Sequence, residues 1–141
     1  MRRMEWAEAS QFLLTGARTA NVATVGADGQ PHVVPVWFTL DDGDLVFSTS
    51  SASVKGRNLK REPRVALSVD EQAPPFAFVS IRGAAQLQSR PDDLLAWTTR
   101  IAERYLEPER ASDVGTSNAQ IDDLLVRVRI VSFTAMADLV E

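Results

Sequence analysis

The sequence predicts a mainly β protein, a small and partly open barrel of six antiparallel strands with flanking helices. Two kinds of observation lead to this fold class. Apolar residues alternate with a period of two in several stretches, which is typical of strands with one buried face. Turn sequences of the hairpin type, Gly26–Gly29 (GADG) and Asp41–Asp44 (DDGD), join such stretches. At 141 residues the chain is expected to form one domain over residues 1–141.

The composition is that of a globular protein and argues against several classes of function. Hydrophobic residues make up 45% of the chain and charged residues 24%, which favours a packed core over disorder. The net charge of −4 argues against general nucleic-acid binding. Because the chain has no cysteine and a single histidine, neither a disulfide framework nor a Cys/His metal site is expected. No apolar run has the length of a signal-peptide core or a membrane span, which predicts a cytoplasmic protein without a membrane partner.

The first three predicted elements are a helix and a pair of strands. Apolar residues at helical spacing predict a helix over residues 5–15, with Gly16 as its C-terminal cap. The period then changes to two and predicts a strand over residues 18–25. The return strand, residues 31–40, contains the sequence VVPVWF and is apolar on both faces, which predicts that one face meets a partner or a flat ligand. Pro35 cannot donate a ladder hydrogen bond, so one edge of this strand is expected to be open or bulged.

The third predicted strand, residues 45–49, leads into a capped helix. A short polar loop, Ser50–Ala52, follows the strand. Ser53 is then placed to cap a helix that ends at about Arg61, before Pro63.

The predicted helix belongs to the most basic part of the chain. Residues 55–64 carry a net charge of +4 in a chain whose net charge is −4, with one acid (Glu62) against five cations: Lys55, Arg57, Lys60, Arg61 and Arg64. The start of a helix offers unpaired N–H groups and the positive end of the helix dipole, and Ser48–Ser51 add hydroxyl donors next to it. This order favours a bound phosphate. A basic helix face that meets only solvent is the alternative.

The second half of the chain predicts three further strands and two helices. A β-bulge is expected at Gly83, where the alternation is interrupted. Trp97 and Tyr105 belong to an apolar helical stripe and are expected in the core. The segment Glu109–Asn118 is polar and a candidate for a mobile region. The predicted strands cover residues 65–69, 76–87 and 125–137, and the predicted helices cover residues 91–105 and 119–124.

Several short motifs occur in one order and together closely resemble the pyridoxamine 5′-phosphate oxidase-like split-barrel proteins. The most specific motif is KGRNLKREPR at residues 55–64; the others are DGQPH (28–32), PVWF (35–38), FST (47–49) and GAA (83–85). Within that family the chain looks most like the short actinobacterial branch that uses the deazaflavin coenzyme F420. The resemblance covers about residues 5–137.

The resemblance implies a six-stranded antiparallel split barrel that forms a homodimer, with one cofactor in each of two clefts between the subunits. In such proteins the cofactor's phosphate lies near the loop after the third strand, and its ring lies along the second strand, whose backbone hydrogen-bonds the pyrimidine edge. The candidate cofactor-binding residues are therefore His32, Val33, Val34, Pro35, Val36, Trp37, Ser48, Thr49, Ser50, Ser51, Ser53, Lys55, Arg57, Asn58, Lys60, Arg61 and Arg64.

The function that the resemblance implies is that of an F420-dependent oxidoreductase, which transfers hydride from the reduced coenzyme to a small conjugated organic substrate. Since the cofactor supplies the chemistry, no catalytic residue is assigned. His32 either touches the ring edge or ends a turn.

Two alternatives to the F420 enzyme stay open. One is an oxidoreductase of the same fold that uses flavin mononucleotide (FMN), since both cofactors carry a ribityl phosphate. Lys60, Arg61 and Arg64 could instead meet the glutamate tail that only the deazaflavin has. The other is a non-enzymatic protein that binds F420 or another planar ligand such as a tetrapyrrole.

Overall fold

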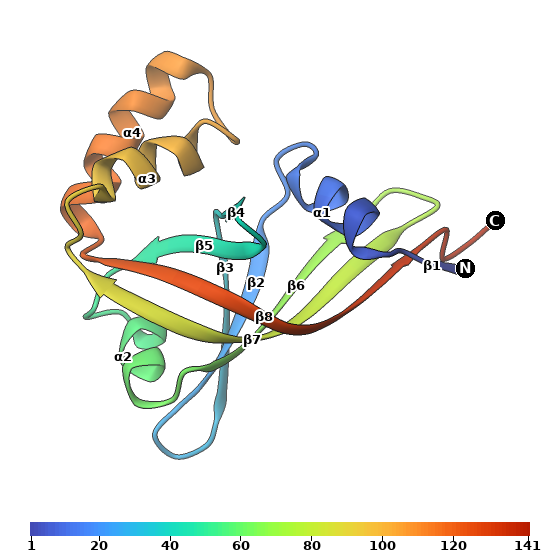
Figure 1. Ribbon diagram of the computed structural model, residues 1–141, viewed down its shortest axis with the longest axis horizontal. Helices are drawn as coiled ribbons and strands as arrows, with labels where there is room; N and C mark the ends of the chain where they lie inside the picture. The colour runs from blue at the N-terminus through green and yellow to red at the C-terminus, as the bar shows by residue number, and fades with distance from the viewer.

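Eight strands form one antiparallel sheet in the computed structural model, which describes residues 1–141 (Figure 1). The strands are β1 (Arg2–Arg3), β2 (Ala20–Val25), β3 (Pro31–Val36), β4 (Thr39–Asp41), β5 (Asp44–Thr49), β6 (Arg64–Glu71), β7 (Ala77–Ser89) and β8 (Leu124–Ala137). The helices are α1 (Trp6–Leu14), α2 (Val54–Arg61), α3 (Leu94–Ala102) and α4 (Pro108–Ile121). The strand order is β3-β2-β6-β7-β8-β5-β4, and β1 pairs with β8.

The helices lie at different ends of this sheet. In Figure 1, α3 and α4 stand together beyond β5, α2 lies below the left-hand part of β7, and α1 lies near β6. The long strands β7 and β8 run side by side through the molecule and pair over their whole length (Figure 1). Since no helix is both long and apolar enough, none could cross a membrane.

The expected number of six strands was wrong, and the main reason lies at Trp37 and Phe38. The predicted strand over residues 31–40 is two strands, because the chain changes partner between them. Residues up to Val36 pair with β2, whereas β4 pairs with β5. Phe38 is completely buried at this change of partner. The eighth strand is β1, a two-residue pairing with β8 that no sequence period could reveal.

The expected mobile segment at residues 109–118 was also wrong, because these residues belong to helix α4. Pro108 occupies its first turn, where the missing N–H costs nothing. The only fully buried residues of α4 are Ala111 and Gly115. With only these small residues buried, α4 lacks the large apolar stripe that would have identified it. The short helix expected over residues 119–124 is in fact the last turn of α4 and the start of β8.

The remaining elements agree with the sequence predictions to within a few residues. Twenty buried residues form one hydrophobic cluster, to which alternate residues of β2, β6 and β7 contribute. The predicted bulge at Gly83 is confirmed by a register shift between Arg82 and Gly83. A Cβ atom on Gly83 would lie 2.5 Å from Val128 Cγ1, so β8 passes too close for any other residue. Pro35 lies on β3, whose outer edge has no neighbouring strand, as expected.

Replacement of Gly115 by Ala is expected to destabilise the α3–α4 pair, although Ala is the better helix former. A Cβ at this position would lie 2.7 Å from Thr99 Cα and 2.9 Å from Thr99 N, and these backbone atoms can move only if the helices separate. We expect the free energy of unfolding, measured with urea, to fall by about 1–3 kcal/mol. The higher helix propensity of Ala alone would raise the free energy of unfolding by about 1 kcal/mol.

The matched control for this variant is Ser117→Ala, on the exposed side of α4. It is expected to leave the free energy of unfolding within about 0.5 kcal/mol of the wild-type value. An increase in stability for Gly115→Ala would mean that the two helices do not approach this closely.

Candidate functional site

The start of helix α2 is built as the sequence predicted. The Ser53 hydroxyl accepts a hydrogen bond from the Gly56 N–H at 3.0 Å and donates one to the Ser50 carbonyl at 2.7 Å. It also shares a hydrogen bond of 2.9 Å with the Thr49 hydroxyl. Gly56 is buried, and a Cβ there would collide with the Ser50 carbonyl oxygen. The loop is thereby held against the positive end of the helix dipole.

A polar cavity of about 210 Å³ opens at this helix start. Six of the predicted cofactor-binding residues line it together, from β3 and the residue after it (Pro35, Val36, Trp37), from β5 (Ser48, Thr49) and from α2 (Lys55). The α3–α4 pair and the corner before β8 supply the rest of the wall: Thr98, Ile101, Asn118 and Asp122. Lys55 has no hydrogen bond or ion pair within the protein, so its ammonium group is available to a ligand.

The indole of Trp37 is held in place at this cavity by Tyr105. The two rings stack with their centroids 4.7 Å apart and their planes 11° from parallel. The Tyr105 hydroxyl donates to the Arg18 carbonyl at 2.8 Å and accepts from the Phe38 N–H at 3.2 Å. Burial raises the pKa of this phenol, which keeps it a donor. Tyr105 is half-buried and supports the ring of Trp37, whereas the sequence had predicted that it lies in the core.

The other cations of the basic block do not line this cavity, because they lie on other sides of α2 or, for Arg64, beyond its end. Arg57 and Lys60 are exposed. Arg61 donates to the Val25 carbonyl at 3.0 Å and to Asn58 Oδ1 at 2.9 Å. Arg64 forms an ion pair of 2.6 Å with Glu62.

Asn58 is buried between α2 and β2, where it donates to the Thr24 hydroxyl at 3.0 Å. Its position favours a structural role. His32 and Val34 are half-buried on the same face of β3, and His32 Nδ1 has no hydrogen-bond partner. Val33 points to the opposite face and is 65% exposed.

Two carboxylates that the sequence predictions missed hold the serine loop. Ser48 Oγ donates to Asp122 Oδ2 at 2.8 Å. Asp123 accepts from the Ser51 N–H at 2.6 Å and from the Ser51 hydroxyl at 2.7 Å. The hydroxyls predicted to face a phosphate are therefore engaged with protein groups. The sequence did carry one signal for these two carboxylates. Two adjacent acids stand at the C-terminus of helix α4, where the helix dipole disfavours negative charge.

The pKa values of the two aspartates shift in opposite directions. Burial raises the pKa of Asp122, and the nearby Asp123 raises it further, against the opposing effects of the Ser48 hydrogen bond and Lys55. The hydrogen bonds from the Ser51 hydroxyl and N–H lower the pKa of Asp123.

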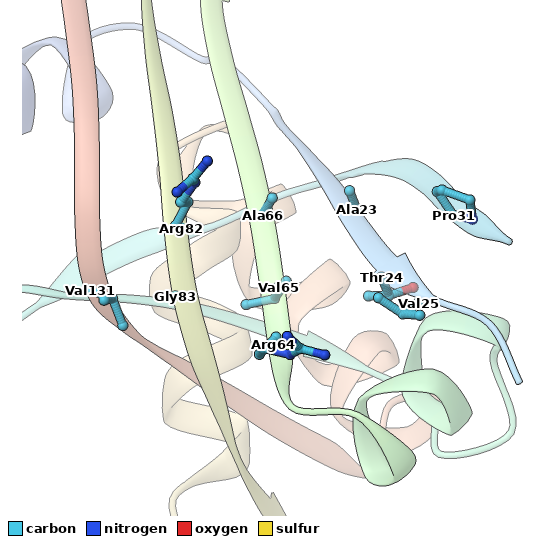
Figure 2. Close-up of a pocket in the computed structure, with 10 residues that line it drawn as sticks. All are labelled: Ala23, Thr24, Val25, Pro31, Arg64, Val65, Ala66, Arg82, Gly83 and Val131. Atoms are coloured by element: carbon cyan, nitrogen blue, oxygen red, sulfur yellow. The ribbon is translucent and has the colours of Figure 1, made fainter. Parts of the chain in front are cut away.

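A second, larger hollow of about 560 Å³ lies on the outer face of the sheet (Figure 2). Ala23, Ala66 and Arg82 lie opposite one another across β2, β6 and β7, and Val33 extends this row onto β3. Val131, on β8, lies at the side of the hollow and is 72% exposed. The hollow is lined by Ala23, Thr24, Val25, Pro31, Arg64, Val65, Ala66, Arg82, Gly83 and Val131.

The chemistry of these two hollows is that of an anion site beside an apolar surface. Lys55 and the start of α2 can bind a phosphate group. Strand β3, which lies at the edge of the sheet, contributes Pro35 and Val36 to this cavity and Pro31 to the outer hollow. No group of three or more His, Asp or Glu side chains lies close enough to hold a metal ion.

Comparison with known proteins gives one family and a set of similar folds. Residues 6–136 match the family model described as pyridoxamine 5′-phosphate oxidase. A conserved hypothetical protein of Mycobacterium tuberculosis is 27% identical, with a TM-score of 0.83 over 96% of this chain and 86% of that one. A protein named F420 reductase is 28% identical, with a TM-score of 0.70 over 87% of this chain and 94% of that one. The heme storage protein of Vibrio cholerae, 19% identical with a TM-score of 0.72 over 92% of this chain and 94% of that one, shares the fold alone.

Replacement of Asp123 by Asn is expected to destabilise the protein in a pH-dependent way. Because the folded protein holds the pKa of Asp123 below its ordinary value of 3.8, the carboxylate stabilises the fold above that value. This contribution is lost as the pH falls through the lowered pKa. The difference in melting temperature between wild type and variant should therefore be largest near neutral pH and shrink towards about pH 3.

Asp113→Asn provides the control for the change of charge. Asp113 is exposed on α4 and makes no hydrogen bond. An equal, pH-independent effect of both substitutions would mean that the Ser51 hydrogen bonds do not hold the loop.

Proposed function

This chain belongs to the pyridoxamine 5′-phosphate oxidase family, and we propose that it is an oxidoreductase that uses the deazaflavin coenzyme F420. Hydride would pass from the reduced coenzyme to a small conjugated organic substrate. The observation that carries this proposal is the cavity in which Lys55, at the start of α2, lies beside the end of β3 and the end of β5.

The phosphate of the cofactor would bind at Lys55. This side chain has no partner within the protein, and it lies in the first turn of α2, where N–H groups and the helix dipole also favour an anion. A charge-assisted hydrogen bond in a half-buried site is stronger than one between neutral groups. The residues present therefore fit a ribityl phosphate.

The ring of the cofactor would lie along β3. The outer edge of this strand is unpaired, so alternate N–H and C=O groups are available to the pyrimidine edge. Val33 and Pro35 are exposed on one face and offer an apolar surface to a flat ring. The bound cofactor supplies hydride transfer, and the residues of this chain bind it, orient it and exclude water.

F420 is favoured over FMN by two observations. A protein named F420 reductase is 28% identical over most of both chains. Arg57 and Lys60 are exposed cations without partners beyond the phosphate position, where they could meet the carboxylates of a glutamate tail. Arg61 and Arg64 contribute less to this argument, because each is already engaged within the protein.

A homodimer is part of the proposal, because the outer face of the sheet carries apolar groups that water would otherwise cover. Val33 is 65% and Val131 72% exposed, and the hollow between them is lined by small residues such as Ala23 and Ala66 (Figure 2). A second copy of the chain would bury this face and enclose a cofactor that lies along β3.

Replacement of Lys55 by Ala is expected to weaken cofactor binding by about 1.5–3 kcal/mol, the range for hydrogen bonds to charged groups. The dissociation constant, measured by fluorescence titration, should rise by a factor of about 10 to 150 for both F420 and FMN. The fold should be retained, since the Lys55 side chain makes no hydrogen bond or ion pair within the protein.

The control is Lys60→Ala, which removes an exposed cation from the same helix. It should weaken the binding of long-tailed F420 by at most about fivefold and leave FMN binding unchanged. Unchanged dissociation constants for Lys55→Ala would contradict the phosphate position. If wild type binds FMN as tightly as F420, the FMN-dependent enzyme becomes the better proposal.

A separate measurement distinguishes an enzyme from a carrier. Mass spectrometry of the small molecules released from purified protein would identify the bound cofactor. Consumption of reduced F420 in the presence of conjugated acceptors would then support an oxidoreductase, whereas binding without turnover for any acceptor would support a non-enzymatic binder.

Replacement of Ala66 by Arg is expected to disrupt the proposed dimer. Light scattering of wild type should give about twice the chain mass of 15.5 kDa. Ala66 lies in the middle of the outer hollow, so a large charged side chain there would have to be buried against the second copy (Figure 2). Ser112→Arg, on the exposed side of α4, should leave the mass unchanged. A monomeric wild type that still binds cofactor fully would refute the shared cleft.

A further inference from the structure

We infer that Asp122 is a specificity-determining residue of the Lys55 cavity, and that it selects a phosphodiester with one negative charge over a phosphomonoester with two. Lys55 is also the residue on which the proposed function depends, so this role of Asp122 deepens that function. The phosphate of F420 is a diester, because the lactate and glutamate tail is attached to it, whereas the phosphate of FMN is a monoester. Asp122 would thus discriminate between the two cofactors.

The geometry brings Asp122 into the same small space as the cation. Asp122 follows the last residue of α4, lines the cavity and accepts the hydrogen bond of 2.8 Å from Ser48. A volume of about 210 Å³ has room for about seven water molecules. Lys55 is near enough to Asp122 to affect its pKa, so a phosphate group bound at Lys55 in this small cavity also lies near the Asp122 carboxyl group.

Few charged groups surround Asp122 in this cavity. Lys55 of α2 is the only cation that lines the cavity, and Asp123 is the nearest other acid. The groups from β3, β5, α3 and α4 are neutral: Pro35, Val36, Trp37, Ser48, Thr49, Thr98, Ile101 and Asn118. With Asp122 ionised, the cavity has no net charge, so a second negative charge on the ligand finds no second cation to offset it.

The protonation of Asp122 removes this penalty in two ways. The neutral carboxyl group no longer repels the ligand. Once protonated, Oδ2 can also donate to Ser48 Oγ instead of accepting from it, which leaves the Ser48 proton free to reach the anion. Burial already raises the pKa of Asp122, so the neutral form becomes populated at a higher pH than in an exposed aspartate. An anion should therefore bind with uptake of a proton and should bind more tightly as the pH falls.

The test compares the two cofactors in wild type, Asp122→Asn and Asp113→Asn, with dissociation constants from fluorescence titration at about pH 8. Asp122→Asn keeps the size of the side chain and its acceptor for Ser48 but has no charge. We expect it to tighten FMN binding about tenfold and F420 binding clearly less. Each cofactor is the same molecule in every variant, and any effect of Asp122 on the tail carboxylates would favour F420, so a shift of the ratio of the two constants towards FMN reports the phosphate group. Asp113→Asn, an exposed acid of α4, should change neither constant.

A second readout is the pH dependence of F420 binding. A phosphodiester does not change its charge near neutral pH, and the other ionisable groups of F420 are the same for both proteins, so the difference between the pH profiles of wild type and Asp122→Asn reports Asp122. Wild type should bind F420 more tightly as the pH falls from about 8 to about 5, whereas Asp122→Asn should give a flatter profile. Parallel profiles for the two proteins would overturn the role of Asp122. If the variant does not fold, the probe is sulfate with wild type, and an equal rise in melting temperature at about pH 8 and about pH 5 would overturn that role.

The outcomes separate this role from the proposed function. If F420 binds but Asp122→Asn changes both constants by the same factor, or neither, Asp122 has no selective role while the proposed function stands. If neither cofactor binds, the proposed function fails, and sulfate becomes the probe because it is a dianion over this whole pH range. Sulfate should then raise the melting temperature of Asp122→Asn more than that of wild type at about pH 8. Equal stabilisation of the two proteins would overturn the role of Asp122.

Discussion

The structure depends on how the buried backbone of Phe38 satisfies its hydrogen bonds. At this residue the chain has left β2 and has not yet joined β5, so no strand can pair with it. Tyr105 accepts the Phe38 N–H, and Arg104 donates to the Phe38 carbonyl. Since an unpaired buried peptide group would be costly, the end of α3 is thereby tied to the sheet.

This tie also shapes the cavity at Lys55. Tyr105 supports the ring of Trp37 from one side, and α3 contributes Thr98 and Ile101 to the wall. Arg104 continues the connection to α1 by a hydrogen bond of 2.9 Å to the Leu13 carbonyl. Burial lowers the pKa of this guanidinium group, but it stays charged at any physiological pH. The helix pair is therefore a fixed wall of the cavity.

The corner between α4 and β8 joins three elements at the other side of the cavity. Asp122 binds β5 through Ser48, and Asp123 binds the loop before α2 through Ser51. Both bonds use hydroxyls that were expected to donate to the phosphate, so protein groups position this loop. Lys55 and the helix start are left as the groups that a ligand can reach.

The sequence by itself determined the local features of this protein: the strand alternation, the hairpin turns, the bulge at Gly83 and the cap of α2 at Ser53. These depend on neighbouring residues, whose spacing can be read along the chain. Only the tertiary structure decided the break at Phe38, the helix α4 and the directions of the cations. It also brought Asp122 to Lys55, which lies 67 residues earlier in the chain. The reason is that hydrogen bonds and close helix packing between distant residues leave no period in the sequence.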